Sequence, residues 1–480
     1  MERILSVAEM RAADEYTINN TGVSADILVE RAGGAVAEEI TKRFKGGRVL
    51  VCTGKGNNGK DGKVVAAILS KKHGFSVSTF SAEVGFFKIF EKNFDIIVDC
   101  LFGTGLDREI TGRYKTAVEK INESGAFVVS CDIPSGINGD SGKVMGVAVK
   151  ANLTVAIQEY KTGHFLNDGV DYTGKVVAKD IGISVWTEDC SHRITDKDAA
   201  SFFPDRPRNI HKGDGGKIAV VGGSKKYSGS VLLSYSALCA YKTGAGYAAI
   251  AVPDCIFSVV AGVNPECLIL TLPDNGDSMI FNEKALKPLL DYDAIAFGMG
   301  AGVTEDTYKS LVFLLENYTG RLVIDADGLN TLAAFGTGVL KSEKRKCEVV
   351  LTPHIGEFIK LSDKNKDEIL SDAIAQAKAF AKEYGITLLL KNAVSVITDG
   401  NKTIINTTGD SGMAKGGSGD VLSGFIAGLL NRDDEPVFCV GVAAYIFGKA
   451  GEIAAKEQNS YTMTASDIIA ALPKAINKVL

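Results

Sequence analysis

The chain has 480 residues, of which 45% are hydrophobic and 23% are charged, and its formal net charge is −5 at pH 7. This length exceeds what one hydrophobic core usually serves, so we expect two domains. The small negative charge gives no general attraction to nucleic acid, and no basic stripe is present, so nucleic acid is not an expected partner.

The N-terminus and the cysteines predict a cytoplasmic protein. Residues 1–6 carry charge at once and lack a continuous apolar segment, so we see no secretory signal. No uncharged apolar stretch reaches the roughly 18 residues that a membrane helix needs, so no membrane partner is expected. The nine cysteines are scattered and form no Cys-x-x-Cys pair, which favours reduced core residues.

Short β-rich runs alternate with helical stretches from Arg48 onward. We predict strands at 49–53, 76–80, 96–101 and 126–131 in the first half, and at 294–297, 322–325, 349–352, 387–391 and 395–398 in the second. This alternation is typical of parallel α/β layers. The pattern breaks into polar and turn residues over 186–212, so we place a domain boundary near residue 190. Two α/β domains, 1–190 and 191–480, are expected.

A glycine-rich loop, Gly-Lys-Gly-Asn-Asn-Gly-Lys-Asp-Gly at 54–62, follows the first strong strand and opens a helix. As a P-loop it would end in Asp61, an acid that lacks the hydroxyl needed beside a nucleotide-bound Mg²⁺ and that repels phosphate. As a G-x-G-x-x-G loop it has Glu83 beyond the next strand as a ribose-binding acid, but two adjacent asparagines are not required by such a loop. Neither pattern alone accounts for the segment.

Two later strands end in polar motifs that should meet this loop. One is Asp-Cys-Leu-Phe-Gly-Thr-Gly at 99–105, and the other is Asp-Ile-Pro-Ser-Gly at 132–136. Loops at the carboxyl ends of neighbouring parallel strands share one crevice. Asn58, Asp99 and Ser135 would supply hard oxygen ligands, which suit an alkali or alkaline-earth cation. Asp132 is a candidate acid–base residue; the alternative is that Asp99 and Asp132 only cap strand ends.

The most informative segment of the second half is Gly-Met-Ala-Lys-Gly-Gly-Ser-Gly-Asp-Val at 412–421. Its glycines and serine leave backbone N–H groups open to a phosphate, and the apolar run that follows predicts a helix whose N-terminal end favours the same anion. Asp420 would then meet a substrate hydroxyl as a base. The alternative is a glycine-rich turn in which Asp420 is an N-cap.

These motifs together resemble known enzymes. The segments 54–62, 99–105 and 132–136 resemble the NAD(P)H-hydrate epimerases, whose Rossmann-like domain binds potassium. The C-terminal half resembles the ribokinase-like NAD(P)H-hydrate dehydratases through the segments 211–216, 221–224, 298–302, 325–330, 352–357 and 412–421. The two occur fused in this order in the bifunctional NAD(P)H-hydrate repair enzymes, and the resemblance covers nearly the whole chain.

The resemblance implies a fold and an activity for each half. It implies a three-layer, Rossmann-like α/β/α epimerase domain that interconverts the R and S forms of hydrated NADH and NADPH (NADHX and NADPHX). It also implies a ribokinase-like α/β dehydratase domain that converts the S form to NAD(P)H with ADP, giving AMP and phosphate. K⁺ in the epimerase domain, Mg²⁺ and ADP in the dehydratase domain, and a homo-oligomer are the cofactors and assembly implied.

The resemblance also implies individual site residues. The K⁺ ligands would be Asn58, Asp99 and Ser135. The hydrated nicotinamide would be contacted in the N-terminal half by Asn57, Asn58, Gly59, Lys60, Asp61, Gly103, Thr104, Gly105, Leu106, Asp107, Arg108, Glu109, Asp132 and Lys161. In the C-terminal half it would be contacted by Gly302, His354, Ile355, Gly356, Glu357, Phe358, Ile359, Lys360 and Asp420. ADP would be contacted by Lys391, Asn392, Ala393, Val394, Ser395, Asp410, Ser411, Gly412, Met413, Ala414, Lys415, Gly416, Gly417, Ser418 and Gly419.

Lys60 departs from the family pattern, in which the loop reads Asn-Asn-Gly-Gly-Asp-Gly. A side chain at this position would crowd the loop or force a different φ, which would affect the epimerase activity and leave the dehydratase activity unchanged.

For the dehydratase we expect Asp420 to take the proton of the C6 hydroxyl as that oxygen attacks the terminal phosphoryl group of ADP, while the amides of 414–419 stabilise the charge. For the epimerase we expect Asp132 to act as acid–base. Two rival functions remain: a vitamin or sugar kinase of the ribokinase superfamily, and a nucleotide-sensing protein without catalysis.

Overall fold

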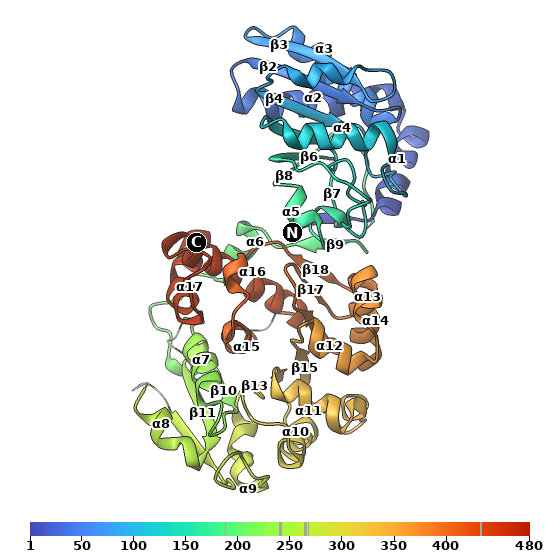
Figure 1. Cartoon of the computed structure of the whole chain (residues 1–480). Coiled ribbons are helices and arrows are strands. Elements are labelled where there is room, and N and C mark those ends of the chain that lie inside the picture. Colours follow the sequence, from blue (N-terminus) through green and yellow to red (C-terminus); the bar gives the residue numbers. More distant parts are fainter. Residues whose placement is uncertain (188, 240–241, 264–265, 267, 433) are drawn as a thin grey trace. The chain divides into compact units, whose positions relative to one another are not determined.

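The computed structural model describes residues 1–480 apart from 188, 240–241, 264–265, 267 and 433 (Figure 1). The described chain divides into two compact units. One is Arg3–Ser191, and the other combines Met1–Glu2 with His192–Leu480. Each unit is an α/β structure, and the prediction of two α/β domains is confirmed.

The N-terminal unit is built on a six-stranded parallel sheet. Its strands, in spatial order, are β3 (Phe75–Ser81), β2 (Gly47–Thr53), β4 (Ile96–Cys100), β5 (Phe127–Cys131), β6 (Leu153–Ile157) and β8 (Lys175–Lys179). Strands β2, β4 and β5 are buried over most of their length, which a parallel sheet covered on both faces requires. Outside this sheet, β1 (Glu2–Leu5) pairs in parallel with β7 (Tyr160–Lys161).

Helices cover both faces of this sheet. They are α1 (Val7–Asn20), α2 (Ala25–Arg43), α3 (Asn57–Ser70), α4 (Gly112–Glu123) and α5 (Gly169–Tyr172), with the 3₁₀ turns η1 (Phe87–Glu91) and η2 (Thr162–His164). Successive residues of a strand point to opposite faces. Accordingly, Val49 and Val51 of β2 pack with α2 and α3, whereas Leu50 packs with Val118 of α4 on the other face. The unit is therefore a three-layer α/β/α structure.

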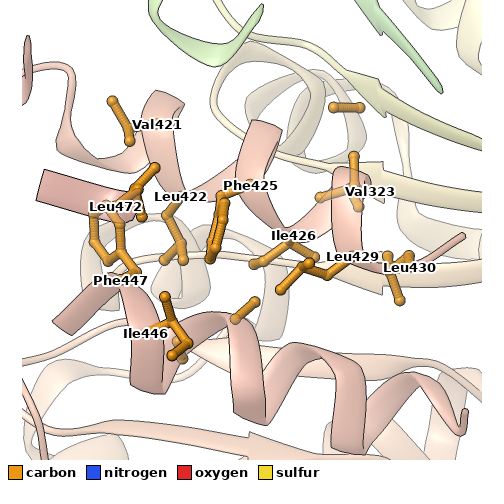
Figure 2. Close-up of a cluster of buried hydrophobic side chains, with 14 of the residues drawn as sticks. Val323, Val421, Leu422, Phe425, Ile426, Leu429, Leu430, Ile446, Phe447 and Leu472 are labelled. Carbon is orange, nitrogen blue, oxygen red and sulfur yellow. The ribbon is translucent and has the colours of Figure 1, made fainter. Parts of the chain in front are cut away.

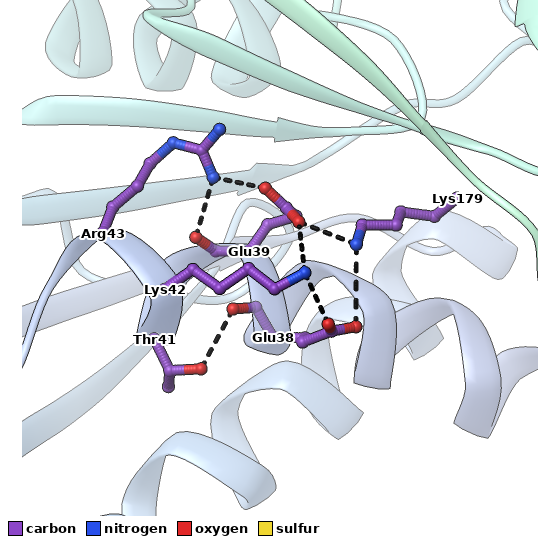
Figure 3. Close-up of polar contacts among 6 residues, drawn as sticks. All are labelled: Glu38, Glu39, Thr41, Lys42, Arg43 and Lys179. Atoms are coloured by element: carbon purple, nitrogen blue, oxygen red, sulfur yellow. Dashed lines mark hydrogen bonds and ion pairs between the residues drawn. The ribbon is translucent and has the colours of Figure 1, made fainter.

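An ion-pair network ties α2 to the edge strand β8 (Figure 3). Lys179 Nζ lies 2.7 Å from Glu39 Oε1, and the same carboxylate accepts from Lys42 at 3.2 Å and from Arg43. Burial alone would raise the pKa of Glu39, but hydrogen bonds from Lys179, Arg43 and Lys42 lower it to about 2. The buried carboxylate thus remains charged and joins α2 to the sheet.

The sheet of the C-terminal unit is mostly parallel. Its strands, in spatial order, are β12 (Leu268–Leu272), β11 (Tyr247–Pro253), β10 (Lys217–Val221), β13 (Ala294–Phe297), β14 (Arg321–Ile324), β15 (Glu348–Leu351), β16 (Thr387–Leu390), β17 (Ser395–Thr398), β18 (Thr403–Asn406) and β9 (Ser191–Arg193). The strands from β12 to β16 run parallel, and β17 is antiparallel to both of its neighbours. The five strands predicted in this half correspond to β13–β17.

The C-terminal unit has a large apolar core, to which the first three and the last three of its helices contribute side chains. The helices of this unit are α6 (Asp196–Phe202), α7 (Ser228–Cys239), α8 (Phe257–Ala261), α9 (Glu283–Leu286), α10 (Glu305–Asn317), α11 (Asp327–Phe335), α12 (Ile355–Ser362), α13 (Lys366–Ser371), α14 (Ala373–Tyr384), α15 (Ser418–Leu429), α16 (Pro436–Glu457) and α17 (Ala465–Val479). Figure 2 shows Phe425 and Ile426 of α15 among Ile446 and Phe447 of α16 and Leu472 of α17. Because α15 is buried over most of its length, the glycine-rich segment before it is held on a rigid element.

One described helix is long and apolar enough to cross a membrane by length and composition. It is α16, and 78% of its apolar window is buried inside the protein. The central helix of a large hydrophobic core is apolar and buried in the same way, so the apolar character of α16 is only weak evidence for a membrane span.

Candidate functional site

The N-terminal unit contains a cavity of about 840 Å³ beside the carboxyl ends of its central strands. Strand β3 lies on one side of β2 and β4 on the other, so the winding of the chain reverses between β2 and β4. Ligands of open parallel sheets bind at such a switch point. The loops after β2 and β4 and the residue after β5 all line the cavity, as their positions in the sequence predict.

Most of the residues predicted for this site line the cavity. They are Asn57, Asn58, Lys60, Asp61, Gly103, Thr104, Gly105, Leu106, Arg108, Glu109, Asp132 and Lys161. Two others do not: Asp107 is exposed, and Gly59 packs against the preceding loop. A Cβ atom at Gly59 would lie 2.0 Å from the carbonyl oxygen of Gly54, so the loop needs glycine there for packing.

The predicted crowding at Lys60 is not seen. Lys60 is the fourth residue of α3, is exposed, and is absent from the residues with positive φ. The tight positions are its neighbours, because a Cβ atom at Gly62 would lie 2.8 Å from that of Cys100. The loop therefore accommodates a lysine at position 60 without backbone strain.

One wall of the cavity was missed by the sequence analysis. It consists of Val7, Met10, Arg11, Asp14 and Ile18 of α1 with Ala25, Asp26, Leu28, Val29 and Ala32 of α2. The α1 residues recur at helical spacing, so a single face of this helix mixes apolar and charged side chains. This mixture of apolar and charged side chains on one helix face could have indicated from the sequence that α1 lines a site.

Asn58, Asp99 and Ser135 are brought together, as predicted. Asn58 Nδ2 donates to the carbonyl oxygens of Phe102 at 2.8 Å and Cys131 at 2.9 Å, and Asn58 Oδ1 is buried without a partner among the described residues. The fully buried Asp99 accepts from the Ser135 hydroxyl at 2.6 Å and from its N–H at 2.9 Å. Burial raises the pKa of Asp99, and the Ser135 bonds oppose that rise.

Asp132 follows β5 in a conformation unusual for a residue with a side chain. Its φ is +66°, and backbone strain of this kind concentrates at functional sites. Lys161 Nζ donates to Asp132 Oδ1 at 2.5 Å, and the N–H of Ile157 donates to the same oxygen at 3.2 Å. Lys161 is 1% exposed, so the Asp132 carboxylate is the partner that compensates a buried cation.

His164 locks this pair in place. Its Nδ1 accepts from the N–H of Lys161 at 3.0 Å, so Nε2 carries the proton and donates to the carbonyl oxygen of Asp132 at 2.7 Å. Burial and the charge of Lys161 lower the pKa of His164 to about 4. The imidazole is therefore neutral at neutral pH and serves as a fixed support for both residues.

Asp61 lies on α3 and is 8% exposed. Burial and the charge of Asp132 raise the pKa of Asp61 to about 7. A carboxyl with this pKa exchanges its proton readily near neutral pH, which is a property of acid–base residues.

In the C-terminal unit, Asp420 lies in the first turn of α15. The N-cap of this helix is Gly417, whose φ of +91° favours glycine. Burial and the neighbouring Asp325 raise the pKa of Asp420 to about 7, although a hydrogen bond with Ser230 opposes the rise. The glycine-rich segment thus ends in a carboxyl that is poised to act as a base near neutral pH.

A buried ion pair lies beside Asp420. Lys391 Nζ donates to Asp325 Oδ1 at 2.8 Å, and the hydroxyl of Ser423 donates to Asp325 Oδ2. A Cβ atom at Gly419 would lie 3.4 Å from Lys391 Nζ, so the ammonium group is next to the backbone of the glycine-rich segment. This arrangement places a fixed cation where the resemblance predicts nucleotide phosphate.

Other predicted residues of this half are joined to the same cluster. His354 and Glu357 form the capping box of α12, with Glu357 N donating to His354 Nδ1 at 3.1 Å. Burial raises the pKa of Glu357, and the charge of Lys391 lowers it. Asp327, which interacts electrostatically with Asp420, accepts from the N–H of Gly302 at 2.9 Å.

Several predicted contacts have a structural role in the described chain. The side chain of Phe358 is 1% exposed and packs on Phe380 with ring centroids 5.2 Å apart, so only its backbone is open to a ligand. Lys360 Nζ donates to Asn330 Oδ1 at 3.0 Å. Lys415 Nζ donates to the carbonyl oxygens of Tyr461 and Met463, both at 2.6 Å, and thereby fixes the glycine-rich segment. The remaining predicted residues lie in three places. Ile355, Gly356 and Ile359 belong to α12, which follows His354. Asn392, Ala393 and Val394 form the turn between Lys391 and β17, which begins at Ser395, and Asp410, Ser411, Gly412, Met413, Ala414 and Gly416 precede α15.

Asp325, Asp327, Ser423 and Ser230 were not among the predicted site residues. The signal for the first two was present, because Asp325 directly follows β14, Asp327 begins α11 and the intervening Ala326 has a φ of +49°. A strained residue between two acids at the end of a parallel strand indicates a functional turn. The serines had no such signal, because only the packing of α7 and α15 brings them to the site.

Comparison with known proteins finds a matching family model for each half of the chain. A family model described as NAD(P)H-hydrate dehydratase matches residues 218–474, and one described as YjeF-related protein N-terminus matches 25–88 and 83–163. The bifunctional NAD(P)H-hydrate repair enzyme of Archaeoglobus fulgidus is 34% identical over 475 residues, with 95% of each chain covered. The chain belongs to the bifunctional NAD(P)H-hydrate repair enzymes. The resemblance drawn from the motifs is confirmed.

Further relatives agree with this family assignment. The repair enzyme of Thermofilum pendens is 32% identical over 511 residues, covering 99% of this chain and 96% of its own. The crystal structure of the ADP/ATP-dependent NAD(P)H-hydrate dehydratase from Bacillus subtilis, co-crystallised with ATP and Mg²⁺, matches with a TM-score of 0.52 and 25% identity. It covers 60% of this chain and 99% of that chain. The chain is therefore an enzyme with an epimerase domain and a ribokinase-like dehydratase domain.

Proposed function

We propose that this enzyme restores hydrated NADH and NADPH, with R and S forms interconverted in the N-terminal unit and the S form dehydrated with ADP in the C-terminal unit. The observation that carries the dehydratase proposal is Asp420, a carboxyl with a pKa of about 7 in the first turn of a buried helix that follows a glycine-rich segment. Family membership supports the choice of substrate.

The dehydration step needs a better leaving group than hydroxide. Asp420 takes the proton of the C6 hydroxyl as its oxygen attacks the terminal phosphorus of ADP, so the new O–P bond forms while the bond to the AMP oxygen breaks. Phosphate then leaves C6 with its bonding electrons, and loss of a proton from C5 restores the ring double bond. The amides of 414–419 and Lys391 stabilise the phosphoryl charge.

Mg²⁺ would enter this site with the nucleotide. The described residues contain no group of three or more His, Cys, Asp or Glu side chains that could hold a metal ion. Mg²⁺ commonly takes one or two carboxylates and completes its shell with phosphates and water, so the carboxylates beside Asp420 are sufficient. When bound, it neutralises nucleotide oxygens. We propose ADP as the nucleotide, and the Bacillus subtilis relative is named as accepting ADP or ATP.

The Asp420→Asn variant tests the dehydratase proposal. We expect its turnover of S-NADHX to fall by about 100-fold or more while nucleotide affinity is retained, because an amide cannot take the proton. Recovery of reduced-nicotinamide absorbance with ADP and Mg²⁺ measures the rate. In the wild type this rate should fall below about pH 7, where Asp420 becomes protonated. Turnover of Asp420→Asn within a few-fold of the wild type would remove the residue from its role.

For the epimerase site we propose that K⁺ is held by Asn58, Asp99 and Ser135. The donor set fits, since Asn58 Oδ1 is a buried oxygen without a partner among the described residues and Asp99 is a fully buried carboxylate. A bound K⁺ would supply a fixed positive charge at the carboxyl ends of β2 and β4. We propose Asp132 as an acid–base residue, and an Asp132→Ala enzyme that still accelerates epimerisation would end that assignment.

The assembly and location of the enzyme are also proposals. We propose a homo-oligomer in the cytoplasm, which size-exclusion chromatography with light scattering and cell fractionation can test. A small-molecule kinase would release a stable phosphorylated product, whereas this enzyme should release inorganic phosphate together with NAD(P)H. A nucleotide sensor would bind ADP and show no turnover.

A further inference from the structure

Inversion at C6 of hydrated nicotinamide by ring opening requires two proton-transfer groups, one of them ionised and the other protonated. This inference rests on the proposed epimerase function. C6 carries a hydroxyl and is bonded to the ring nitrogen N1, so it inverts if the C6–N1 bond opens and closes again on the other face. Opening removes a proton from the hydroxyl and adds one to N1. A site that does both needs one ionised base and one protonated acid.

The cavity of the N-terminal unit contains two carboxyls with different partners. Asp132 lines the cavity from the end of β5 and is bound by Lys161 at 2.5 Å, so its charge is compensated. Asp61 lines the same cavity from α3, and its side-chain hydrogen-bond partner among the described residues is the Cys131 thiol at 4.0 Å, a weak donor. The two carboxyls interact electrostatically, which places them near each other.

Asp61 is held at this place by the packing of α3. The flanking Gly59 and Gly62 contact the backbone of Gly54 and the side chain of Cys100 so closely that neither position has room for a Cβ atom. The first turns of α3 are therefore pressed onto β2 and β4, and Asp61 is 8% exposed with its remaining surface on the cavity. A buried carboxyl without a cationic contact is stable mainly in its protonated form.

We propose that Asp61 is a second catalytic residue of the epimerase and that it works as the protonated acid opposite the ionised base Asp132. Asp132 takes the proton of the C6 hydroxyl, the C6–O bond becomes a carbonyl, and the C6–N1 bond breaks with its electrons on N1. Asp61 donates its proton to N1. Rotation about the C5–C6 bond turns the other face of the aldehyde to N1. N1 then attacks C6, its proton returns to Asp61, and Asp132 returns its proton to the oxygen.

The surroundings of Asp61 favour a proton at neutral pH. Burial and Asp132 raise the pKa of Asp61 to about 7, Lys60 of α3 lowers it, and Asp14 of α1 raises it. Lys161 is paired with Asp132, and the pKa values of the buried thiols of Cys100 and Cys131 are raised. The other titratable or charged side chains that line the cavity are Arg11, Asp26, Lys55, Arg108, Glu109 and Tyr114. About half of the Asp61 groups are then protonated near pH 7, and the protonated fraction falls to about one in eleven at pH 8 and about one in a hundred at pH 9.

The test uses the full-length enzyme and purified R-NADHX without nucleotide, with the wild type, Asp61→Asn, Asp61→Glu and the control Glu91→Gln, an exposed residue outside the cavity. The rate of S-NADHX formation above the spontaneous rate is measured from pH 6 to 9. We expect Asp61→Asn to lower kcat about 100-fold or more with KM within a few-fold, and Glu91→Gln to match the wild type. Asp61→Glu should retain part of the activity. The wild-type rate should fall above about pH 7, and Asp61→Asn should lack this fall.

The outcomes separate the two proposals. If the wild type does not exceed the spontaneous rate, the epimerase function fails. If it does and Asp61→Asn keeps its kcat, only this inference is wrong, and a rise in KM alone would make Asp61 a binding residue. A wild-type rate that increases from pH 7 to 9 would also overturn the role as acid. Unchanged ADP-dependent dehydration of S-NADHX and unchanged unfolding show that Asp61→Asn is folded.

Discussion

The buried His164 should make the N-terminal unit sensitive to acid, and replacement by glutamine should remove this sensitivity. His164 is fully buried, and its pKa in the folded chain is about 4, compared with 6.5 for an unperturbed histidine. Between these values the unfolded chain binds a proton that the folded chain does not, so the free energy of unfolding falls as the pH falls. At pH 7 the folded state is unprotonated and only about a quarter of the unfolded chains carry the proton, so the effect there is small. At pH 4.5 the loss is about 2.5 kcal/mol, from 1.36 kcal/mol per unit of pKa difference.

The single tryptophan of the chain allows the unfolding of the N-terminal unit to be measured separately. Trp186 belongs to the N-terminal unit and lies on the ring of Tyr16, with centroids 4.4 Å apart, so its fluorescence reports the unfolding of that unit. Urea unfolding is followed at several values from pH 7 to pH 4.5 for the wild type and His164→Gln.

The comparison between the two proteins isolates His164 from other groups. Asp61 has a raised folded pKa, so its contribution to stability increases on acidification and opposes that of His164. It is present in both proteins and cancels in the difference. We expect His164→Gln to gain about 2.5 kcal/mol relative to the wild type between pH 7 and pH 4.5. A difference that stays constant over this range would show that His164 is not held neutral by burial.

Three further variants test packing at the two sites. Gly59→Ala should prevent native folding of the N-terminal unit, because the added Cβ would lie 2.0 Å from a carbonyl oxygen. Lys60→Gly should lower the free energy of unfolding by only about 1 kcal/mol, the usual cost of glycine in a helix. Trp186 fluorescence measures both effects. Ser423→Ala should destabilise the C-terminal unit by about 1–3 kcal/mol, because one oxygen of the buried Asp325 loses its donor, and faster amide hydrogen exchange in α15 would reveal it. Unchanged exchange would mean that water replaces the hydroxyl.

The sequence was informative where function depends on local backbone. The apolar runs that became β2, β4 and β14 and the glycine-rich segments before α3 and α15 could be recognised because strand burial and backbone access leave short, regular patterns. Parallel topology then placed their carboxyl ends together, which is how Asn58, Asp99 and Ser135 could be predicted to meet.

What could not be predicted depends on contacts between distant segments. Lys391 and Asp325 are 66 residues apart, and Ser423 is 98 residues from Asp325, so no local pattern shows that the three bond. The wall formed by α1 and α2 was missed for the same reason. The role of His164 was also hidden, since its pKa depends on its own burial in the folded unit and on the charge of Lys161. Lys60 was misjudged because the crowded positions of the loop are its neighbours.

The two sites, although built on different folds, use the same electrostatic arrangement. Each has one aspartate paired to a lysine that is little exposed, Asp132 with Lys161 and Asp325 with Lys391, and a second aspartate early in a helix that follows a glycine-rich loop. Because the lysine compensates its own partner, the second carboxyl experiences burial and a like charge, and the pKa values of Asp61 and Asp420 are both raised to about 7. The proposed roles then differ only in the proton: an acid must hold it and a base must lack it. Epimerisation should therefore weaken and dehydration strengthen as the pH rises through 7, so that both steps run together only near neutrality.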